Sequence, residues 1–302
     1  MKGLNFILKE CTSLRYFVPV IDEAKSRGIK SNFFIGRSRK YNCPFLDKNR
    51  KQLNEVINYF QMGVYELGKD KISKSQGGVT ITTEGVGIEH INEELFNISM
   101  SSMTDFTVSY KNYADKVDHI LLPSEFMAKY YHDMEVYPID GTPAGGTYTD
   151  KNIYFGSTKY DIDLNNFSYG LKHMPKDKIK ILFFAPNRSD SKSYKIFSNL
   201  LKEVSKHENV MSIVKTRGKH KVPKNLQGDM YLEDAHWYPH TSMVLINESD
   251  ISVTFGSTVT KECVMLNKPF INIDMKKFKH LDFLNSESCV RIEDEKSINY
   301  DT

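Results

Sequence analysis

Residues 245–274 read LINESDISVTFGSTVTKECVMLNKPFINID, and this stretch decides the fold class. Residues 251–255 alternate isoleucine, valine and phenylalanine with serine and threonine, a pattern typical of a strand. Gly256 follows directly, where a backbone without a Cβ atom turns at no steric cost. Ser257 and Thr258 come next and are common N-cap residues, so they predict the start of a helix.

A helix and a second strand are predicted after this turn. Val259, Cys263 and Leu266 are spaced i, i+4 and i+7, which indicates a helix with one apolar face. Asn267 is expected to end that helix, and residues 270–273 return as a strand. The sequence therefore predicts a βαβ unit whose helix N-terminus lies at the carboxyl end of a strand, a place suited to anions.

Two interpretations of this unit are open from its residues alone. In the first, Glu262 lies about one turn into the helix and accepts hydrogen bonds from sugar hydroxyls beside a bound anion. In the second, the unit is an ordinary part of a parallel sheet, and Ser257 and Thr258 only cap a helix.

The same stretch resembles the donor-nucleotide segment of GT-B glycosyltransferases, most closely the group of CDP-glycerol glycerophosphotransferases and surface-polysaccharide transferases. The shared order is a strand, a small-residue turn, a glutamate-bearing helix and a Lys-Pro strand, found here at residues 250–255, residues 256–258, Glu262 and residues 267–271. The resemblance implies an α/β fold with two Rossmann-like parallel-sheet domains facing a central cleft. It assigns four residues to donor binding: Gly256, Ser257, Thr258 and Glu262.

Repeated strand and helix patterns in both halves support that architecture. The second half restarts at residues 179–185 with the apolar run IKILFFA, as expected for a parallel strand covered on both faces. A polar stretch at residues 161–178 precedes it. We therefore expect an N-terminal acceptor-side domain at residues 1–165 and a C-terminal donor domain at residues 166–302.

Composition indicates an ordinary globular protein. The 302 residues are 40% hydrophobic and 26% charged, and Lys+Arg 41 against Asp+Glu 38 gives a net charge of only +3. This balance argues against a nucleic-acid partner, which calls for a concentrated basic surface. The four cysteines form no C-x-x-C pair, which fits a reduced cytoplasmic protein, and no apolar run reaches the roughly 18 residues of a membrane span.

Polar and cationic residues follow two further predicted strands. Asn187 and Arg188 come after residues 179–185, and the next strand, at residues 210–215, leads into a second group: Lys215, Arg217, Lys219 and His220. Carboxyl ends of parallel strands meet at one edge of a sheet, so these side chains can together bind a diphosphate. The alternative is a solvated charged loop. The resemblance favours the diphosphate, because this group of enzymes carries a basic or histidine-containing loop at the matching place.

Two aromatic residues, Trp237 and Tyr238, precede the opening segment. The single tryptophan either stacks on a nucleobase or seals the base of the second domain, and the sequence alone leaves both interpretations open. His240 begins a predicted short helix that leads into the strand at residues 251–255.

The acceptor side is expected in the first domain. In the CDP-glycerol transferases a histidine beside a glycine is thought to act there as general base, but the corresponding residues 98–105 contain no histidine. Candidate catalytic bases from this domain are Asp105, Glu84 and His90. A carboxylate in a closed site needs only a modestly raised pKa to take a proton from a hydroxyl. Each of the three is also explained as an ordinary surface residue.

No bound metal is predicted. Residues 161–163 spell Asp-Ile-Asp, the string that holds a divalent metal in the other glycosyltransferase fold, but they lie in the stretch between the domains rather than at the end of a strand. We attribute the match to chance. No cofactor is expected either. The donor, a nucleotide-activated sugar or CDP-glycerol, is a substrate whose leaving diphosphate is stabilised by backbone amides and cations.

The resemblance implies a glycosyltransferase or glycerophosphotransferase that moves a group from a nucleotide-activated donor to a cell-surface glycan precursor, the acceptor being a glycan or a lipid-linked glycan. Two alternatives stay open. A non-hydrolysing UDP-N-acetylglucosamine 2-epimerase has the same architecture and a similar glutamate-bearing helix. A catalytically silent GT-B binding protein also keeps the fold, and the missing histidine in residues 98–105 favours it.

A basic cluster follows the last strand of the opening segment, at Lys276, Lys277, Phe278 and Lys279. A solvated loop and a weak, salt-sensitive contact with an anionic membrane both fit it. We expect a cytoplasmic protein with transient contact at the inner face of the membrane. GT-B enzymes usually end with a helix that returns to the first domain, and the residues after Asp294 lack that pattern. We therefore expect loosely tethered domains or a chain trimmed at its end.

Overall fold

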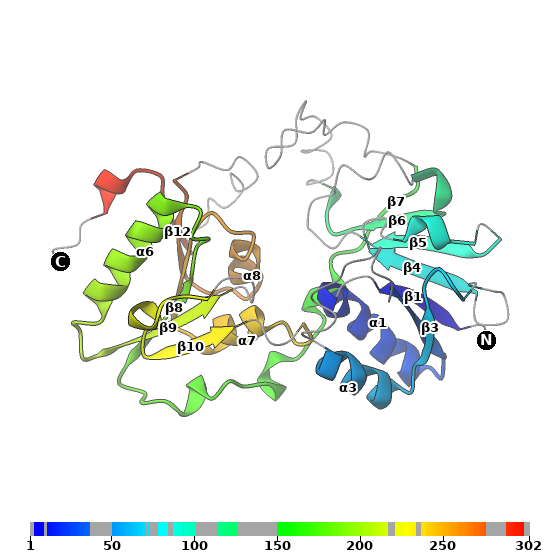
Figure 1. Cartoon of the computed structure of the whole chain (residues 1–302), viewed down its shortest axis with the longest axis horizontal. Coiled ribbons are helices and arrows are strands. Elements are labelled where there is room, and N and C mark those ends of the chain that lie inside the picture. Colours follow the sequence, from blue (N-terminus) through cyan, green and yellow to red (C-terminus); the bar gives the residue numbers. More distant parts are fainter. Residues whose placement is uncertain are drawn as a thin grey trace. The chain divides into compact units, whose positions relative to one another are not determined.

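The structure is a computed structural model. It describes these residues: 3–8, 11–36, 50–70, 72, 78–83, 87–92, 94–100, 114–125, 150–216, 221–233, 237–275 and 288–298. The chain divides into two units, Met1–Ile162 and Asp163–Thr302. In its described part each unit is built on a parallel β-sheet with helices (Figure 1), so the predicted α/β class with two Rossmann-like domains is confirmed.

The sheet of the first unit has seven described strands in the order β3-β2-β1-β4-β5-β6-β7, and all neighbouring pairs are parallel. The strands are β1 (Leu4–Leu8), β2 (Ser31–Ile35), β3 (Gly63–Glu66), β4 (Val79–Thr83), β5 (Phe96–Met100), β6 (His119–Leu122) and β7 (Asn152–Tyr154). β1 pairs on both sides and is buried on both faces, which explains why its sequence LNFIL is almost entirely apolar.

Two helices of the first unit, α1 (Leu14–Ser26) and α3 (Arg50–Phe60), contact each other and lie on the same side of its sheet (Figure 1). The ring of Phe17 in α1 packs against Phe6 of β1, with the two ring centroids 5.0 Å apart. Phe6 also contacts Phe33 of β2, so the centre of this sheet carries an aromatic core.

The sheet of the second unit has six described strands in the order β10-β9-β8-β11-β12-β13, again all parallel. The strands are β8 (Ile179–Phe184), β9 (Val210–Thr216), β10 (Met230–Glu233), β11 (Ile251–Thr254), β12 (Phe270–Ile273) and β13 (Cys289–Ile292). The predicted strands at residues 179–185, 251–255 and 270–273 are therefore present, each within a residue of its expected limits.

Helices cover both faces of the second sheet (Figure 1). On one face α6 (Ser191–Val204) packs Phe197 against Phe183 of β8. On the other face α7 (Thr241–Glu248) and α8 (Thr260–Met265) share a core that contains Leu182, Leu245 and Cys263. Within the described residues no helix is both long and apolar enough to cross a membrane.

Candidate functional site

The strand order of the second sheet indicates where a ligand is expected to bind. From β8 the order proceeds through β9 and β10 toward one edge, and from β11 through β12 and β13 toward the other. The direction of winding therefore reverses between β8 and β11. Open parallel sheets bind ligands outside the carboxyl ends of their strands at such a point. The segments that follow Phe184 and Thr254 both start there.

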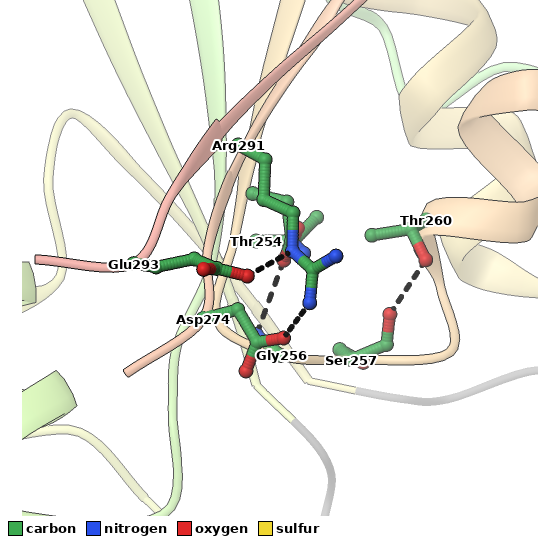
Figure 2. A network of polar contacts seen from close by, with 8 residues as sticks. Thr254, Gly256, Ser257, Thr260, Asp274, Arg291 and Glu293 are labelled. Atoms are coloured by element: carbon green, nitrogen blue, oxygen red, sulfur yellow. Dashed lines mark hydrogen bonds and ion pairs between the residues drawn. The ribbon is translucent and has the colours of Figure 1, made fainter. Parts of the chain in front are cut away.

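The segment after β11 is a tight turn closed by its own hydrogen bonds. Gly256 has φ of +53°, a left-handed conformation that side chains disfavour. The carbonyl oxygen of Ser257 accepts hydrogen bonds from the amide of Thr260 at 3.2 Å and from its hydroxyl at 2.8 Å, and Figure 2 draws the hydroxyl contact. α8 begins only at Thr260 and has no side-chain cap, so the prediction that Ser257 and Thr258 cap the helix is wrong. Both residues instead belong to the turn.

The rest of α8 follows the predicted periodicity. Val259 and Cys263 lie in the core, Leu266 packs against it, and Asn267 ends the helix with φ of +50°. Burial raises the pKa of the Cys263 thiol to about 12, although a hydrogen bond with Ser252 opposes the shift.

A buried polar pair lies where α7 and α8 meet. Glu262 on α8 is only 3% exposed, and its Oε1 lies 3.4 Å from Nδ1 of His240 at the start of α7. The imidazole of His240 stacks on the indole of Trp237, with centroids 5.2 Å apart and ring planes 9° from parallel. One face of the buried Trp237 ring is thus covered by protein, which favours the sealing role over nucleobase stacking. A buried carboxylate requires a polar or charged partner, and His240 is that partner for Glu262.

The predicted cationic residues lie in different surroundings. Lys215 is inside β9 rather than on the loop after it, because the strand extends to Thr216. Lys215 is 4% exposed, and its Nζ lies 5.6 Å from the ring centroid of Phe184. Arg188 is exposed and lies over the ring of Tyr194, at 5.8 Å from its centroid.

The remaining residues of that group either serve a loop or lie outside the described part. Asn187 is exposed, and its Oδ1 accepts a hydrogen bond from the amide of Ser189 at 3.1 Å. It thereby shapes the loop that leads into α6. Three predicted cationic residues lie outside the described residues: Arg217, Lys219 and His220.

The candidates for a catalytic base come from the first unit. His90 lies in a short 3-10 turn, with its Nε2 3.5 Å from the Oε1 of Glu89. Asp105 and Glu84 lie outside the described residues. The catalytic role of all three stays a prediction.

The Asp-Ile-Asp string has a local structural role. Asp163 accepts hydrogen bonds from the amide of Asn165 at 3.0 Å and the side chain of Asn166 at 3.3 Å, and so caps a 3-10 turn. Among the residues that the structure describes, no group of three or more His, Cys, Asp or Glu side chains is placed to hold a metal ion. The lysines at positions 276, 277 and 279 are outside those residues.

A further polar cluster lies next to the Gly256 turn and was not predicted from the sequence. Arg291 of β13 reaches two carboxylates, with Nη2 3.1 Å from Asp274 Oδ2 and Nε 2.9 Å from Glu293 Oε1 (Figure 2). Beside it, Asn272 of β12 accepts a hydrogen bond from the Gly256 amide at 3.2 Å. The sequence does contain a signal for this cluster. Asn272 and Asp274 are two residues apart in an otherwise apolar strand, so both side chains lie on the same face.

Comparison with known proteins identifies the fold through solved structures. No protein-family model matches the sequence, and a search of curated proteins found no match. Solved structures do match. One is UDP-GlcNAc 2-epimerase from Neisseria meningitidis bound to UDP-GlcNAc, at 13% identity and a TM-score of 0.54, covering 90% of this chain and 82% of that one.

Two glycosyltransferases are also similar. Spinosyn rhamnosyltransferase SpnG complexed with thymidine diphosphate shares 9% identity at a TM-score of 0.51, with 98% of this chain and 87% of that chain covered. MurG from Acinetobacter baumannii shares 6% identity at a TM-score of 0.51, with 99% and 88% covered. At such identities the likeness establishes the fold alone. The chain has the two-domain, Rossmann-like GT-B fold.

Proposed function

We propose that the chain is a transferase that binds a nucleotide-activated sugar or polyol phosphate at the carboxyl edge of the second sheet and passes the activated group to a hydroxyl of a glycan acceptor. The observation that carries the proposal is the buried carboxylate of Glu262, in the first turn of α8 and just after the Gly256 turn. The structural likeness to GT-B glycosyltransferases supports it.

Glu262 suits the ribose of such a donor. An ionised carboxylate only accepts hydrogen bonds, and its two oxygens can receive them from two neighbouring hydroxyl groups. Burial strengthens these bonds, because water competes less at low dielectric. His240, 3.4 Å from Oε1, orients the carboxylate before the donor arrives.

In the proposed reaction an acceptor hydroxyl attacks the activated carbon or phosphorus of the donor. The bond from that atom to the leaving phosphate oxygen breaks, and the hydroxyl proton passes to a base, for which His90, Asp105 and Glu84 are the candidates. Cations near the carboxyl ends of β8 and β9, among them Arg188 and Lys215, stabilise the charge on the departing nucleotide.

Isothermal titration with UDP, TDP, CDP and GDP tests the donor site. Glu262→Gln keeps the side-chain shape and removes the charge, so we expect roughly 5- to 150-fold weaker binding of the preferred nucleotide, equivalent to about 1–3 kcal/mol. Glu248→Gln is the matched control, because Glu248 is also buried in the second unit but accepts hydrogen bonds from the Ser168 hydroxyl and the Tyr169 amide. The control should lower the Tm and leave the affinity unchanged.

Two results would contradict the proposal. Equal nucleotide affinity in the wild type and in Glu262→Gln would show that Glu262 does not contact the nucleotide. Failure of the wild-type protein to bind any of the four nucleotides removes the donor site itself.

A second candidate is a UDP-GlcNAc 2-epimerase. It is supported by the structural likeness to the Neisseria meningitidis epimerase, whose TM-score of 0.54 is in the same range as the 0.51 of the two transferases above. An epimerase needs no acceptor, so incubation with UDP-GlcNAc alone, followed by proton NMR, distinguishes the two. Formation of the C2 epimer supports the epimerase, whereas release of nucleotide only when an acceptor is present supports the transferase.

A further inference from the structure

A row of polar residues crosses three strands directly below the Gly256 turn. Thr254 of β11 is in register with Asn272 of β12, which is in register with Arg291 of β13. Two residues earlier, the same face of β12 and β13 carries Phe270 and Cys289, which pack in the core around α8. Side chains two apart in a strand share a face, so the face covered by α8 changes from apolar to polar at its carboxyl end.

Asn272 is the centre of this row and contacts the turn. It is fully buried, and its Oδ1 accepts hydrogen bonds from the Thr254 hydroxyl at 2.9 Å and the Gly256 amide at 3.2 Å. A backbone amide can only donate, so the amide oxygen and not the amide nitrogen of Asn272 must face Gly256. The contact therefore fixes the orientation of the Asn272 side chain.

The nitrogen of the Asn272 side-chain amide indicates that this residue does not give the fold its highest stability. Its Nδ2 is buried and has no hydrogen-bond partner in the described part of the structure. A buried donor without a partner destabilises a fold, whereas an apolar side chain at this strand position would avoid that penalty. An apolar side chain would, however, leave the Gly256 amide without the acceptor that Asn272 provides.

We propose that Asn272 is a positioning residue for the donor site, holding the Gly256–Ser257 turn in the shape that receives the nucleotide. This inference rests on the proposed function. Gly256, in its left-handed conformation, connects β11 to the segment that leads into Glu262. Anchoring its amide to β12 ties the turn to the neighbouring strand, so the turn and Glu262 are held in place before the nucleotide binds.

Amide hydrogen exchange tests the anchor without any ligand. The readout is the exchange rate of the Gly256 amide divided by that of the Ser252 amide, which bonds to the Pro269 carbonyl within the same sheet. The ratio separates local opening of the turn from unfolding of the unit. We expect Asn272→Ala to raise this ratio at least tenfold. Asn272→Asp keeps an acceptor oxygen and should leave the ratio near its wild-type value.

Nucleotide affinity tests the functional half of the proposal. We expect the Kd of the preferred nucleoside diphosphate to rise about tenfold in Asn272→Ala. The matched control is Asn97→Ala, since Asn97 is likewise buried in a parallel strand and bonds to the carbonyls of Asn92 and Leu95, but it belongs to the first unit. That variant should change neither the Kd nor the exchange ratio. If Asn272→Ala does not fold, Asn272→Val, which suits a strand, replaces it.

An unchanged exchange ratio in the Asn272 variant would show that Asn272 does not anchor the Gly256 amide, whatever the effect on the Kd of the nucleotide. A raised ratio with an unchanged Kd would show that the anchor is structural only and would overturn the positioning role. A wild-type protein that binds no nucleotide would refute the proposed function and the positioning role together, while the exchange ratio would still report on the anchor itself.

Discussion

The buried thiol of Cys263 gives the second unit a specific sensitivity to alkaline pH. Burial raises its pKa from 9.0 to about 12, so between these values the folded chain keeps a proton that the unfolded chain has lost. The stability that the protonated thiol contributes is fully present below about pH 9 and is lost as the pH rises toward 12. Each pH unit in that window lowers the free energy of unfolding by about 1.4 kcal/mol, which amounts to about 4 kcal/mol over the whole window.

Lysines and tyrosines also titrate in that range, so the measurement compares the wild type with Cys263→Ala, in which those groups are the same. Unfolding by urea is followed through the fluorescence of Trp237, the single tryptophan, which is buried in the same unit. Loss of the thiol changes stability by an offset independent of pH. From pH 9 to 10.5 the wild type should lose about 2 kcal/mol more than the variant. A constant difference across that range would refute the burial of the thiol.

Three further predictions for the second unit use the same fluorescence assay. Arg291→Met leaves the buried Asp274 carboxylate without its ion pair and should cost about 3–5 kcal/mol, part of which Asp274→Asn should restore; no recovery would contradict the pairing. Asp190→Ala removes the cap that accepts from the Ser193 amide and should cost about 1 kcal/mol, whereas no loss would show that the cap is unimportant. Gly256→Ala places a side chain at φ of +53° and should cost roughly 1–2 kcal/mol, and a neutral effect would contradict that conformation.

The sequence predicted those parts of the fold that are buried on both faces. The run at residues 179–185 and the strand at residues 270–273 are rich in apolar residues, because central parallel strands have a helix-covered core on each side. β3, β7 and β10 were not predicted. All three are edge strands without a fully buried residue, and their sequences GVYE, NIY and MYLE contain no run of four or more apolar residues.

The site was only partly predictable for a different reason. Glu262 could be proposed for the donor site because the periodicity of one helix places it relative to a glycine turn that is adjacent in sequence. The contact from Asn272 to Gly256 depends on the pairing of β11 with β12, and the contact from Arg291 to Asp274 on that of β12 with β13. Register between separate strands is a property of the folded sheet, and neither contact follows from spacing along the chain.

The shared strand order has a consequence for how the chain is made. In each sheet the first described strand along the chain, β1 or β8, lies in the interior of the sheet. Of its two neighbours in the sheet, β4 or β11 is the later one along the chain. About 70 to 75 residues separate the end of each of these strands from the end of that neighbour. Translation proceeds at about 5–20 residues per second, so roughly 4–15 s pass between synthesis of the apolar strand and synthesis of its second neighbour in the sheet. Each half of the nascent chain thus passes through an interval in which a chaperone can bind the strand that later forms the middle of the sheet.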